Sequence, residues 1–561
     1  MLNKNDRITL NIVAMSGEGF GIGRFSDETV KDFVVFVAAA AVGDIVEVLV
    51  LKVLKSYAFA KIVSFVETSP DRIKCSCDVF GKCGGCCYRH VGYDAELRYK
   101  TEHVRDVFKK NYPDCPVNIE NALPSVTIDG YRNKAQFPIS EDGKCGYFAI
   151  NSHRVIPCDG CLLTPPVFAE ITKVIENYIS EYSVPVYNET TQKGLLRHVC
   201  IRRAPSTGEI SVVLVATSEI LPHKVQFLSK LTAVEGVKCI YLNINRKNTN
   251  VIYGSKNILL WGEPFITDVL CGCRFEISPM SFYQVNSETC EKLYIYVKDG
   301  LQLKKTDILL DLYCGIGTIG LSCADRVEKV IGIEAVHDAV ENAVRNSYIN
   351  NFDNAEFYYS QASDTADIFK NILPNCHPNV VIVDPPRKGL DAKTIEAVLS
   401  LNPEKFAYIS CDPATLARDL KIFDELGGYV PTVIQPIDMF PRTKHVETVV
   451  LLSHKKPDGH INVKVEFGEG EGKVPLDNIA KRAESYKPKE RVTYKMIKEY
   501  IEAKYGFKVH TAYIAEVKRD LGLPMYDAPN AVEELKQPRK HPTAEKVEAI
   551  KDALKYFGVC S

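Results

Sequence analysis

Two side chains at the ends of apolar runs are suited to covalent chemistry. Cys411 directly follows the run KFAYIS (405–410), where a strand pattern changes to a helix pattern. A thiol at such a turn can be stabilised as the thiolate, which is the nucleophilic form of cysteine. Glu447 begins the run ETVVLLS (447–453), and a carboxylate there can act as a general base. The pair predicts a reaction in which Cys411 attacks the substrate and Glu447 removes a proton.

A glycine-rich loop, GIGTIG (315–320), follows the apolar run ILLDLYC (308–314). Glycines let the backbone turn tightly and approach a nucleotide, and an acid about twenty positions later can bind ribose hydroxyls. Glu334 has this spacing. Taken alone, the pattern also fits a dinucleotide-binding dehydrogenase. Asp384, which ends another apolar run, favours a methyl donor, because a nicotinamide enzyme has no need of an acid at that edge of the sheet.

A group of cysteines has the spacing of metal ligands. Cys77, Cys83 and Cys86 are spaced C-x5-C-x2-C, and Cys158 or Cys161 could supply a fourth ligand. In a reducing compartment such cysteines are expected to be free thiols or metal ligands rather than disulfides. Two C-x2-C pairs would suit a structural zinc site, and thiolate ligands alone do not distinguish zinc from iron.

Composition restricts the class of protein but does not indicate an activity. The formal net charge is −2, so phosphate contacts would have to come from local basic patches. A chain of 561 residues is long enough for roughly three or four domains. No run approaches the ~20 apolar residues of a membrane span, and MLNKNDRITL lacks the features of a secretory signal. We expect a cytoplasmic protein with no membrane partner, and the sequence leaves its protein partners unknown.

Residues 303–455 supply the framework that would bring the reactive side chains together. Repeated strand, loop and helix units predict an α/β fold with a mostly parallel, doubly wound, Rossmann-like sheet. The carboxyl ends of parallel strands lie at one edge of such a sheet, where ligands bind. Asp384, Cys411 and the glycine loop are therefore expected at one edge. The strands are expected in the runs TDILLDLYCG, KVIGIEA, AEFYYSQ, NVVIVDPP and KFAYISCDP, followed by two more strands that end in HVETVVLLS.

The rest of the chain predicts three further parts. Short β-rich runs near the start predict a small OB-like β-barrel, a type of fold that binds RNA in some proteins and is purely structural in others. Alternating helix and strand patterns then predict an α+β insert. We expect a barrel (1–68), a central domain with the cysteine segment (69–290), a catalytic domain (291–456) and a C-terminal extension (457–561).

The C-terminal extension has its own helical pattern. GEGEGK (468–473) is a candidate linker. Thr493 can cap a helix that ends at Gly506, and Thr511 can begin a second helix. We expect a small helix-turn-helix-like module that either binds nucleic acid or packs as an appendage. The apolar side chains expected to point inward are Tyr494, Ile497, Ile501, Ile514, Val517 and Leu521.

Five motifs carry a resemblance to a known family. They are SFYQVN (281–286), DLYCGIGTIGL (311–321), DPPRKGL (384–390), SCDPATLARDL (410–420) and HVETVVLL (445–452). Together they resemble the RNA uracil-C5 methyltransferase family, in the branch that modifies 23S ribosomal RNA. The resemblance implies S-adenosylmethionine as the methyl donor, with Cys411 as nucleophile and Glu447 as base. The cofactor contacts that it implies are Gln284, Tyr313, Gly315, Gly317, Thr318, Glu334 and Asp384.

The chemistry of uracil explains why such an enzyme needs two reactive residues. Carbon 5 is too weakly nucleophilic to attack a methyl sulfonium directly. A thiolate that adds to carbon 6 generates an enolate with electron density on carbon 5, which then accepts the methyl group. A base must afterwards remove the carbon-5 proton so that the cysteine is eliminated. Cys411 and Glu447 match these two roles.

The resemblance extends to the barrel and the cysteines. SGEGFGIGRF (16–25) is similar to the TRAM domain, an RNA-binding barrel that tRNA-modifying relatives commonly lack, so ribosomal RNA is the favoured substrate. The ribosomal branch binds a [4Fe–4S] cluster, whose ligands by motif are Cys77, Cys83, Cys86 and Cys161.

The resemblance also implies contacts with RNA in the central segment. Arg132, Lys134 and Arg197 lie in matching segments and are expected to hold phosphates. A target uracil must leave its stack to be methylated, so we expect single-stranded or loop RNA. Two alternatives stay open, the same chemistry on transfer RNA and an iron-sulfur RNA-binding protein without catalysis. The second leaves the grouping of Cys411 with Asp384 unexplained.

Overall fold

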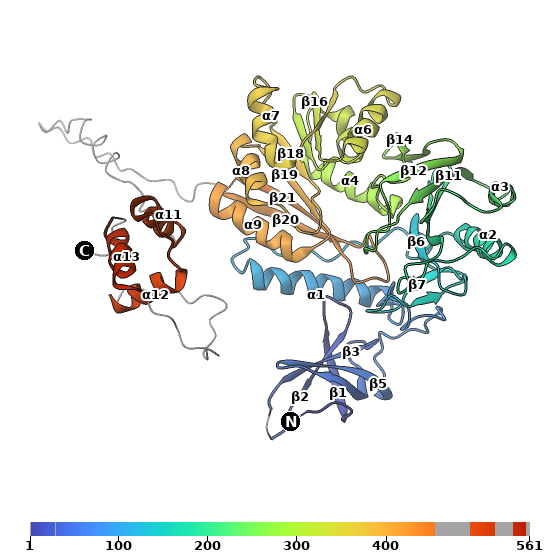
Figure 1. The fold of residues 1–561 in the computed structure, drawn as a ribbon, viewed down its shortest axis with the longest axis horizontal. Coiled ribbons are helices and arrows are strands. Elements are labelled where there is room, and N and C mark those ends of the chain that lie inside the picture. The colour runs from blue at the N-terminus through green and yellow to red at the C-terminus, as the bar shows by residue number, and fades with distance from the viewer. Residues whose placement is uncertain (1, 29, 455–493, 522–541, 557–561) are drawn as a thin grey trace, which may run out of the picture. The chain divides into compact units, whose positions relative to one another are not determined.

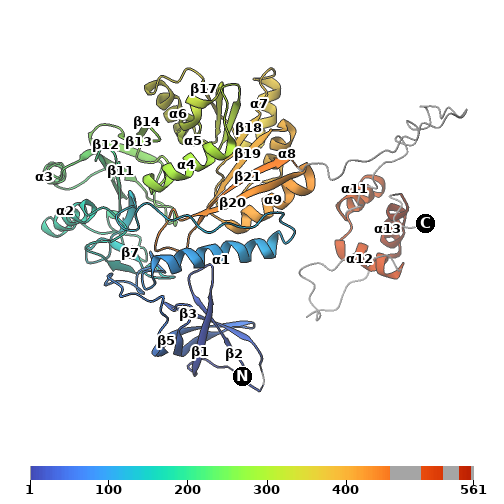
Figure 2. The same cartoon turned by 180° about the vertical axis from the view of Figure 1, so that it is seen from behind.

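The computed structural model describes residues 2–28, 30–454, 494–521 and 542–556. It divides the chain into two compact units, Met1–His460 and Ile461–Ser561. The expected linker at 468–473 and the expected cap Thr493 lie outside the described residues. Figures 1 and 2 show opposite views of the elements named below.

The N-terminal segment forms a closed barrel, as expected. Apolar side chains alternate along each strand, which is the pattern of a sheet with one buried face. Leu10, Ile12, Val35 and Val48 are buried in its interior. One strand, β2, was not expected from the sequence, because it is short and contains two glycines. The strand order is β1-β2-β3-β5-β4, with β1 (Arg7–Met15), β2 (Gly21–Phe25), β3 (Phe33–Ala38), β4 (Ile45–Val53) and β5 (Tyr57–Glu67).

The central segment is built on a sheet with helices on one face. Helices α2 (Val167–Glu181) and α3 (Lys224–Leu231) pack against the sheet through a large apolar core. The other face has only a small apolar cluster around Cys200 and Val213. The sheet order is β12-β11-β10-β9-β6, with β6 (Lys134–Pro138), β9 (Leu196–Arg203), β10 (Ile210–Ala216), β11 (Val237–Ile244) and β12 (Lys256–Gly262); β7 (Gly146–Phe148) and β8 (Val155–Pro157) form a separate hairpin.

The catalytic segment contains the expected doubly wound sheet. Its seven strands have the order β17-β16-β15-β18-β19-β21-β20, and β21 is the strand that runs antiparallel to both of its neighbours. Four of the parallel strands, β15, β16, β18 and β19, are nearly continuous runs of buried residues, as expected for strands covered on both faces, whereas the edge strand β17 has no buried residue. The strands are β15 (Ile308–Leu312), β16 (Lys329–Glu334), β17 (Ala355–Tyr359), β18 (Val380–Val383), β19 (Lys405–Ser410), β20 (Tyr429–Ile437) and β21 (Glu447–His454).

Helices cover both faces of this sheet. One face packs against α4, α5 and α6, and the other against α7, α8 and α9. The hairpin β13–β14 also belongs to the first core, through Ile266 and Phe275, so this core begins before the expected boundary at residue 290. The bounds are β13 (Ile266–Leu270), β14 (Cys273–Ile277), α4 (Ser287–Leu301), α5 (Thr318–Cys323), α6 (His337–Ile349), α7 (Thr365–Asn371), α8 (Ala392–Leu401) and α9 (Pro413–Gly427), with short 3-10 helices at Ala324–Arg326 and Ala362–Asp364.

Helix α1 (Tyr93–Asn111) precedes the central sheet in sequence but packs against the catalytic segment. Both views show it beside α9 (Figures 1 and 2). Its polar face is buried: the Nζ of Lys100 donates hydrogen bonds to Glu96 Oε1 at 2.8 Å and to Asp438 Oδ1 at 2.7 Å. Glu96 also accepts from the backbone N–H of Arg442 at 2.6 Å. These contacts attach α1 to the loop that leads into β21.

The second unit contains three described helices around a shared core. They are α11 (Tyr494–Tyr505), α12 (Thr511–Asp520) and α13 (Ala544–Tyr556). The first two match the expected helices, and Gly506 ends α11 with a left-handed φ of 74°. The expectation for Leu521 was wrong, since this side chain is exposed. Four of the side chains expected to point inward are buried. They are Ile497, Ile501, Ile514 and Val517.

No helix within the described ranges combines the length and the apolar character that crossing a membrane requires.

Candidate active site

Three predicted site residues meet at one edge of the catalytic sheet. Asp384 directly follows β18 and Cys411 directly follows β19, and these parallel strands pair with Val383 opposite Tyr408. Glu447 begins β21, whose next residue pairs with Ser410. The carboxyl ends of the parallel strands and the start of the antiparallel strand therefore coincide.

Local structure holds Cys411 at the beginning of a helix. The side chain of Asp412 caps α9 by accepting hydrogen bonds from the backbone N–H groups of Ala414 and Thr415. Pro413 occupies the first helical turn, where its missing N–H costs nothing. The turn from β19 into α9 leaves the Cys411 side chain half-buried.

The surroundings of Cys411 favour its protonated form. Burial and, to a smaller extent, the nearby carboxyls of Glu447 and Asp384 raise the pKa of the thiol to about 11. Arg387 acts in the opposite direction, through its charge and a hydrogen bond to the thiol. Arg387 is thus the cation beside the candidate nucleophile that favours the thiolate.

The two carboxyl groups also hold their protons more tightly than usual. Burial raises the pKa of Asp384 to about 7. The pKa of Glu447, which is only 3% exposed, is raised by burial and by the charge of Asp384. A carboxyl group that binds a proton more strongly is a better general base near neutral pH. Neutral carboxyls also reduce the electrostatic cost of a thiolate at Cys411.

Two further residues belong to this edge and were not assigned from the sequence. The Nη2 of Arg387 lies 3.4 Å from the Nε2 of His445. Burial and the charge of Arg387 lower the pKa of His445 to about 4, so the imidazole is neutral at pH 7. Both residues stand within motifs already noted, DPPRKGL and HVETVVLL, and the signal that could have identified them is their adjacency to the predicted acid and base.

The glycine loop has the geometry of a ligand cradle. Gly315 has a left-handed φ of 55°, and a Cβ added there would meet no atom within 4 Å. Gly317, by contrast, packs against Phe357 and Leu321. Tyr313, two residues before Gly315, also has a left-handed φ, of 63°. A backbone that approaches a ligand requires open space on the ligand side and close packing on the other side.

Predicted cofactor-binding side chains surround this loop. The carboxylate of Glu334 accepts hydrogen bonds from the backbone N–H groups of Gly315 at 3.0 Å and Val336 at 2.9 Å. The amide of Gln284 donates to Asp384 at 3.5 Å. The hydroxyl of Thr318 lies 3.0 Å from that of Tyr294. Their carboxylate, amide and hydroxyl groups suit the hydroxyl and amino groups of S-adenosylmethionine.

The expected cysteine ligands lie near one another. Cys77 and Cys161 both raise the pKa of Cys83, and Cys161 also raises that of Cys86. Among the described residues, no three of these sulfurs lie within 4.8 Å of one another. Four thiolates around one zinc ion would be roughly 3.8 Å apart, given a Zn–S bond of about 2.3 Å. The donor set is therefore four cysteine thiols, with Cys158 close as well, and such thiols can hold either iron or zinc.

The structure does not support the expected phosphate contact at Arg197. Its side chain is only 6% exposed, and its Nη1 donates to the carbonyl oxygens of Asn245 and Lys247 at 3.1 and 2.8 Å. The guanidinium also stacks on Tyr187, 4.4 Å from the ring centroid. Arg197 is therefore a structural residue of the central sheet. Arg132 and Lys134, in contrast, are half-buried and have no carboxylate partner among the ion pairs of the described residues.

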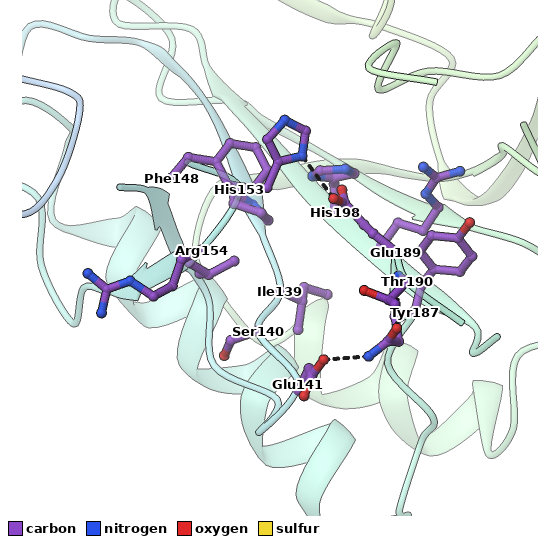
Figure 3. A pocket seen from close by; sticks show the side chains of 14 residues that line it. Ile139, Ser140, Glu141, Phe148, His153, Arg154, Tyr187, Glu189, Thr190 and His198 are labelled. Atoms are coloured by element: carbon purple, nitrogen blue, oxygen red, sulfur yellow. Dashed lines mark hydrogen bonds and ion pairs between the residues drawn. The ribbon is translucent and has the colours of Figure 1, made fainter. Parts of the chain in front are cut away.

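A separate cavity of about 340 Å³ lies in the central segment (Figure 3). His153, Phe148 and His198 line it, and a hydrogen bond of 2.8 Å joins His153 Nδ1 to Glu189. None of its lining residues is a predicted catalytic, cofactor or cluster residue. The catalytic edge is thus not the cavity shown in Figure 3.

Comparisons with known proteins agree with this architecture. Residues 271–455 match the family model described as tRNA (uracil-5-)-methyltransferase, and residues 4–63 match the TRAM domain model. A protein of Clostridium tetani named as an RNA methyltransferase is 39% identical over 457 residues, which are 81% of this chain and 97% of that protein. One of Halalkalibacterium halodurans, also named as an RNA methyltransferase, is 37% identical over 463 residues, 81% of this chain and 98% of its own.

A solved structure is similar over the same extent. It is the Pyrococcus abyssi tRNA (uracil-54, C5)-methyltransferase in complex with S-adenosyl-L-homocysteine, which is 29% identical to this chain with a TM-score of 0.64. The match covers 79% of this chain and 99% of that one. With a five-stranded barrel, a methyltransferase sheet and relatives at this level of identity, the chain belongs to the S-adenosylmethionine-dependent RNA uracil-C5 methyltransferase family, in the form that carries a TRAM domain.

Proposed function

We propose that the protein methylates carbon 5 of a uracil in 23S ribosomal RNA through a covalent adduct with Cys411. The observation that carries the proposal is the meeting of Cys411, Glu447 and Asp384 at one edge of the sheet. A thiol and a base beside the methyl-donor site are what the reaction requires, because the thiol must add to carbon 6 and the base must later remove the carbon-5 proton.

Cys411 begins the reaction. Its sulfur forms a bond to carbon 6 of the uracil, and the electron pair of the 5,6 double bond moves toward carbon 5 and the carbonyl oxygen. Arg387 favours the thiolate form needed for this step, and the raised pKa values of the two carboxyls limit the opposing negative charge. The bound S-adenosylmethionine supplies the methyl group that carbon 5 accepts.

Glu447 completes the reaction. It removes the proton from carbon 5, the 5,6 double bond reforms, and the sulfur of Cys411 leaves carbon 6 with its electron pair. Burial raises the pKa of Glu447, which makes it a stronger base than an exposed glutamate. His445, next to Arg387, is neutral at pH 7. It therefore adds no positive charge that would lower the pKa of Glu447.

The remaining predicted residues have supporting roles. The glycine loop and Glu334 would hold the donor's nucleoside, and Gln284 with Asp384 would lie beside its reactive end. Cys77, Cys83, Cys86 and Cys161 would hold a [4Fe–4S] cluster, whose contribution is to tie the cysteine segment to the central domain. The cluster takes no part in the steps above.

Ribosomal RNA is the preferred substrate because of the TRAM barrel and the cysteine set. Transfer RNA is the second candidate, since the Pyrococcus abyssi neighbour is named for a tRNA uracil. Its match covers 79% of this chain. The central and catalytic segments together, residues 69–455, make up only about 69% of the 561 residues. A tRNA enzyme can therefore resemble this chain beyond the catalytic and central segments.

A trapped adduct tests the proposal. In the Glu447→Gln variant the carbon-5 proton cannot be removed, so the protein should stay bound to methylated RNA through Cys411. We expect a denaturation-resistant complex with unmodified 23S ribosomal RNA on a denaturing gel, and no complex with the Glu447→Gln, Cys411→Ala double variant.

The same experiment separates the alternatives. An adduct with unmodified tRNA instead of 23S RNA would select the second substrate. RNA binding without adduct or methyl transfer by the wild-type protein would select a non-catalytic RNA-binding protein. Normal turnover by Cys411→Ala would contradict the covalent mechanism.

A further inference from the structure

The face of the central sheet opposite α2 and α3 carries two cations that form no ion pair with a carboxylate of the described residues. We propose that Lys134 and Arg202 together bind one phosphate of the RNA backbone close to the uracil that reaches Cys411. The inference rests on the proposed function and adds Arg202, a residue with no motif assignment, to the RNA-binding surface.

Register places the two side chains on the same face. Lys134 of β6 and Arg202 of β9 are directly opposite each other in an antiparallel pair. Residues so paired have neighbouring Cβ atoms, and like charges in this position destabilise the sheet. A pair of cations here therefore requires an explanation other than stability.

Arg202 is the more deeply buried of the two. Its side chain is 4% exposed, and its Nη2 donates to the carbonyl oxygen of Ser281 at 2.7 Å. Its Nε and Nη1 are buried without any hydrogen-bond partner. Arginine stays charged in proteins, so these donors and this charge are uncompensated. Buried unpaired donors and charges cost stability unless a ligand satisfies them.

Lys134 is poised to gain a counter-ion. Its Nζ lies 5.7 Å from the ring centroid of Tyr253, and no described carboxylate forms an ion pair with it or with Arg202. Burial and the charge of Arg202 lower the pKa of Lys134 to about 7. An anion bound between the two cations would raise this pKa and restore the lysine charge.

The position of the pair points to substrate RNA. Ser281, which Arg202 contacts, begins the SFYQVN motif, and Gln284 of that motif lies next to Asp384. Arg132 connects the pair to the catalytic edge, because its charge lowers the pKa of both Lys134 and His445. A phosphodiester suits this site, since guanidinium donors in a fixed fork and an ammonium bind phosphate oxygens well.

The proposal predicts that stability and RNA affinity change in opposite directions in Lys134→Met. Removing one of two buried like charges should raise the melting temperature of the free protein. The same change should weaken binding to an unmodified 23S transcript about tenfold at about 0.1 M salt, and reduce the slope of log affinity against log salt by about 0.7. Binding is measured with S-adenosyl-L-homocysteine, so that no chemistry occurs.

Two other variants complete the test. Lys256→Met is the control, because Lys256 lies at the far edge of the same sheet and pairs with Glu219 at 2.7 Å; it should change neither quantity. Arg202→Lys keeps a charge but loses the fork, so it should fold and bind the transcript several-fold more weakly.

The pH dependence gives an independent readout. The free pKa of Lys134 is about 7 and the bound pKa is higher, so binding takes up a proton. Lys134 therefore contributes fully to RNA affinity below pH 7, and this contribution declines as the pH rises above 7. Wild-type affinity should therefore fall more steeply between pH 6 and pH 9 than that of Lys134→Met, at about 0.1 M salt.

Three outcomes would overturn the inference. They are unchanged RNA affinity and salt slope in Lys134→Met, a loss of stability in that variant, or weaker binding of S-adenosyl-L-homocysteine with normal RNA binding. The last outcome would mean that Lys134 and Arg202 bind the carboxylate of the methyl donor instead of an RNA phosphate. Failure of the proposed function is distinguishable, because the Glu447→Gln variant would then trap no Cys411 adduct and the wild-type protein would transfer no methyl group.

Discussion

At the scale of single residues, the candidate nucleophile is set among groups that oppose its ionisation. The pKa of Cys411 is raised by burial and by two carboxyls, and Arg387 is the cation that lowers it. The fraction of Cys411 present as thiolate depends on the balance between the charge of Arg387 and the charge on the carboxyls of Asp384 and Glu447, which is reduced by their raised pKa values. Arg387 is therefore a positioning and charge-balancing residue for the attack on carbon 6.

Replacing Arg387 with glutamine should make Cys411 less reactive. Without the guanidinium, the pKa of the thiol rises above about 11, so less thiolate exists at any pH below that value. We expect alkylation of Cys411 by iodoacetamide at about pH 8 to slow three- to tenfold, since about one pKa unit is a tenfold change. The rate is measured on the Cys411 peptide by mass spectrometry.

The neighbouring lysine supplies the control for this measurement. Lys388 is exposed in the same loop and is not among the main groups that shift the pKa of Cys411. Lys388→Gln should therefore label at the wild-type rate. Equal rates for the Arg387 variant and the wild type would remove Arg387 from the role given above.

The reactive residues were assigned from the sequence, but their electrostatic partners were not. Cys411 and Asp384 are each marked by a strand end and a motif. Arg387 and His445 act through space, and their 3.4 Å contact joins residues 58 positions apart. Arg197 misled the prediction because β9 is buried on both faces, so a basic residue there does not imply exposure.

At the scale of elements, helix α1 is the support of the loop that carries the base. Lys100 on α1 contacts Asp438, which begins the connection to His445 and Glu447. Tyr93 of the same helix donates from its hydroxyl to the other oxygen of Asp438 at 2.9 Å. The position of the general base thus depends on a helix far away in the sequence.

Lys100→Met should destabilise the protein strongly. The change leaves the carboxylates of Glu96 and Asp438 buried without their shared cation, and breaking a buried ion pair costs about 3–5 kcal/mol. We expect the urea midpoint of the first unit to fall accordingly, as followed by tyrosine absorbance or circular dichroism. Lys109→Met, at an exposed position in the last turn of α1, should leave the midpoint where it is.

Periodicity predicted most elements of the catalytic sheet but not the partners of α1. Helical and strand patterns are local, and each was visible in the runs that became β15 to β21. The docking of α1 on α9 depends on residues such as Tyr112 and Asp424, whose 2.8 Å hydrogen bond spans 312 positions. The hairpin β13–β14 was missed for a related reason, since short strands carry little periodic signal.

At the scale of the whole molecule, about a fifth of the chain lies outside the match to its relatives. The Clostridium tetani and Halalkalibacterium halodurans proteins are matched over 97% and 98% of their own lengths by 81% of this chain. The unit Ile461–Ser561 has its own apolar core of Ile501, Ile514 and Ile550. Its function is therefore separable from the family's reaction.

Removal of residues 461–561 should leave adduct formation intact. We expect the shortened Glu447→Gln protein to trap RNA to the same extent at saturating RNA, within about twofold. We also expect its affinity for the transcript to fall about three- to tenfold, with a smaller salt slope, because basic residues such as Arg519 would no longer reach phosphates. Unchanged affinity would mean that this unit is a packing appendage.

The barrel, the sheet and the two C-terminal helices α11 and α12 were predictable because each has a strong repeating pattern. Helix α13 was not predicted, and the boundary between the central and catalytic segments was placed after the hairpin that shares the catalytic core. The preference for ribosomal RNA came from the resemblance to the TRAM domain and not from the barrel pattern itself, since folds are shared between activities.

Lys100 and Asp438 are 338 positions apart in the sequence. Their contact can therefore form only after the segments between them have been synthesised. The barrel and central sheet can complete their cores as they leave the ribosome, because their strands lie close together along the chain. Helix α1 has to wait, with an apolar face and a lysine still exposed, until β20 has been synthesised. Newly made chains should therefore depend on a chaperone during this interval, and a stall in translation before residue 438 should leave α1 accessible to protease.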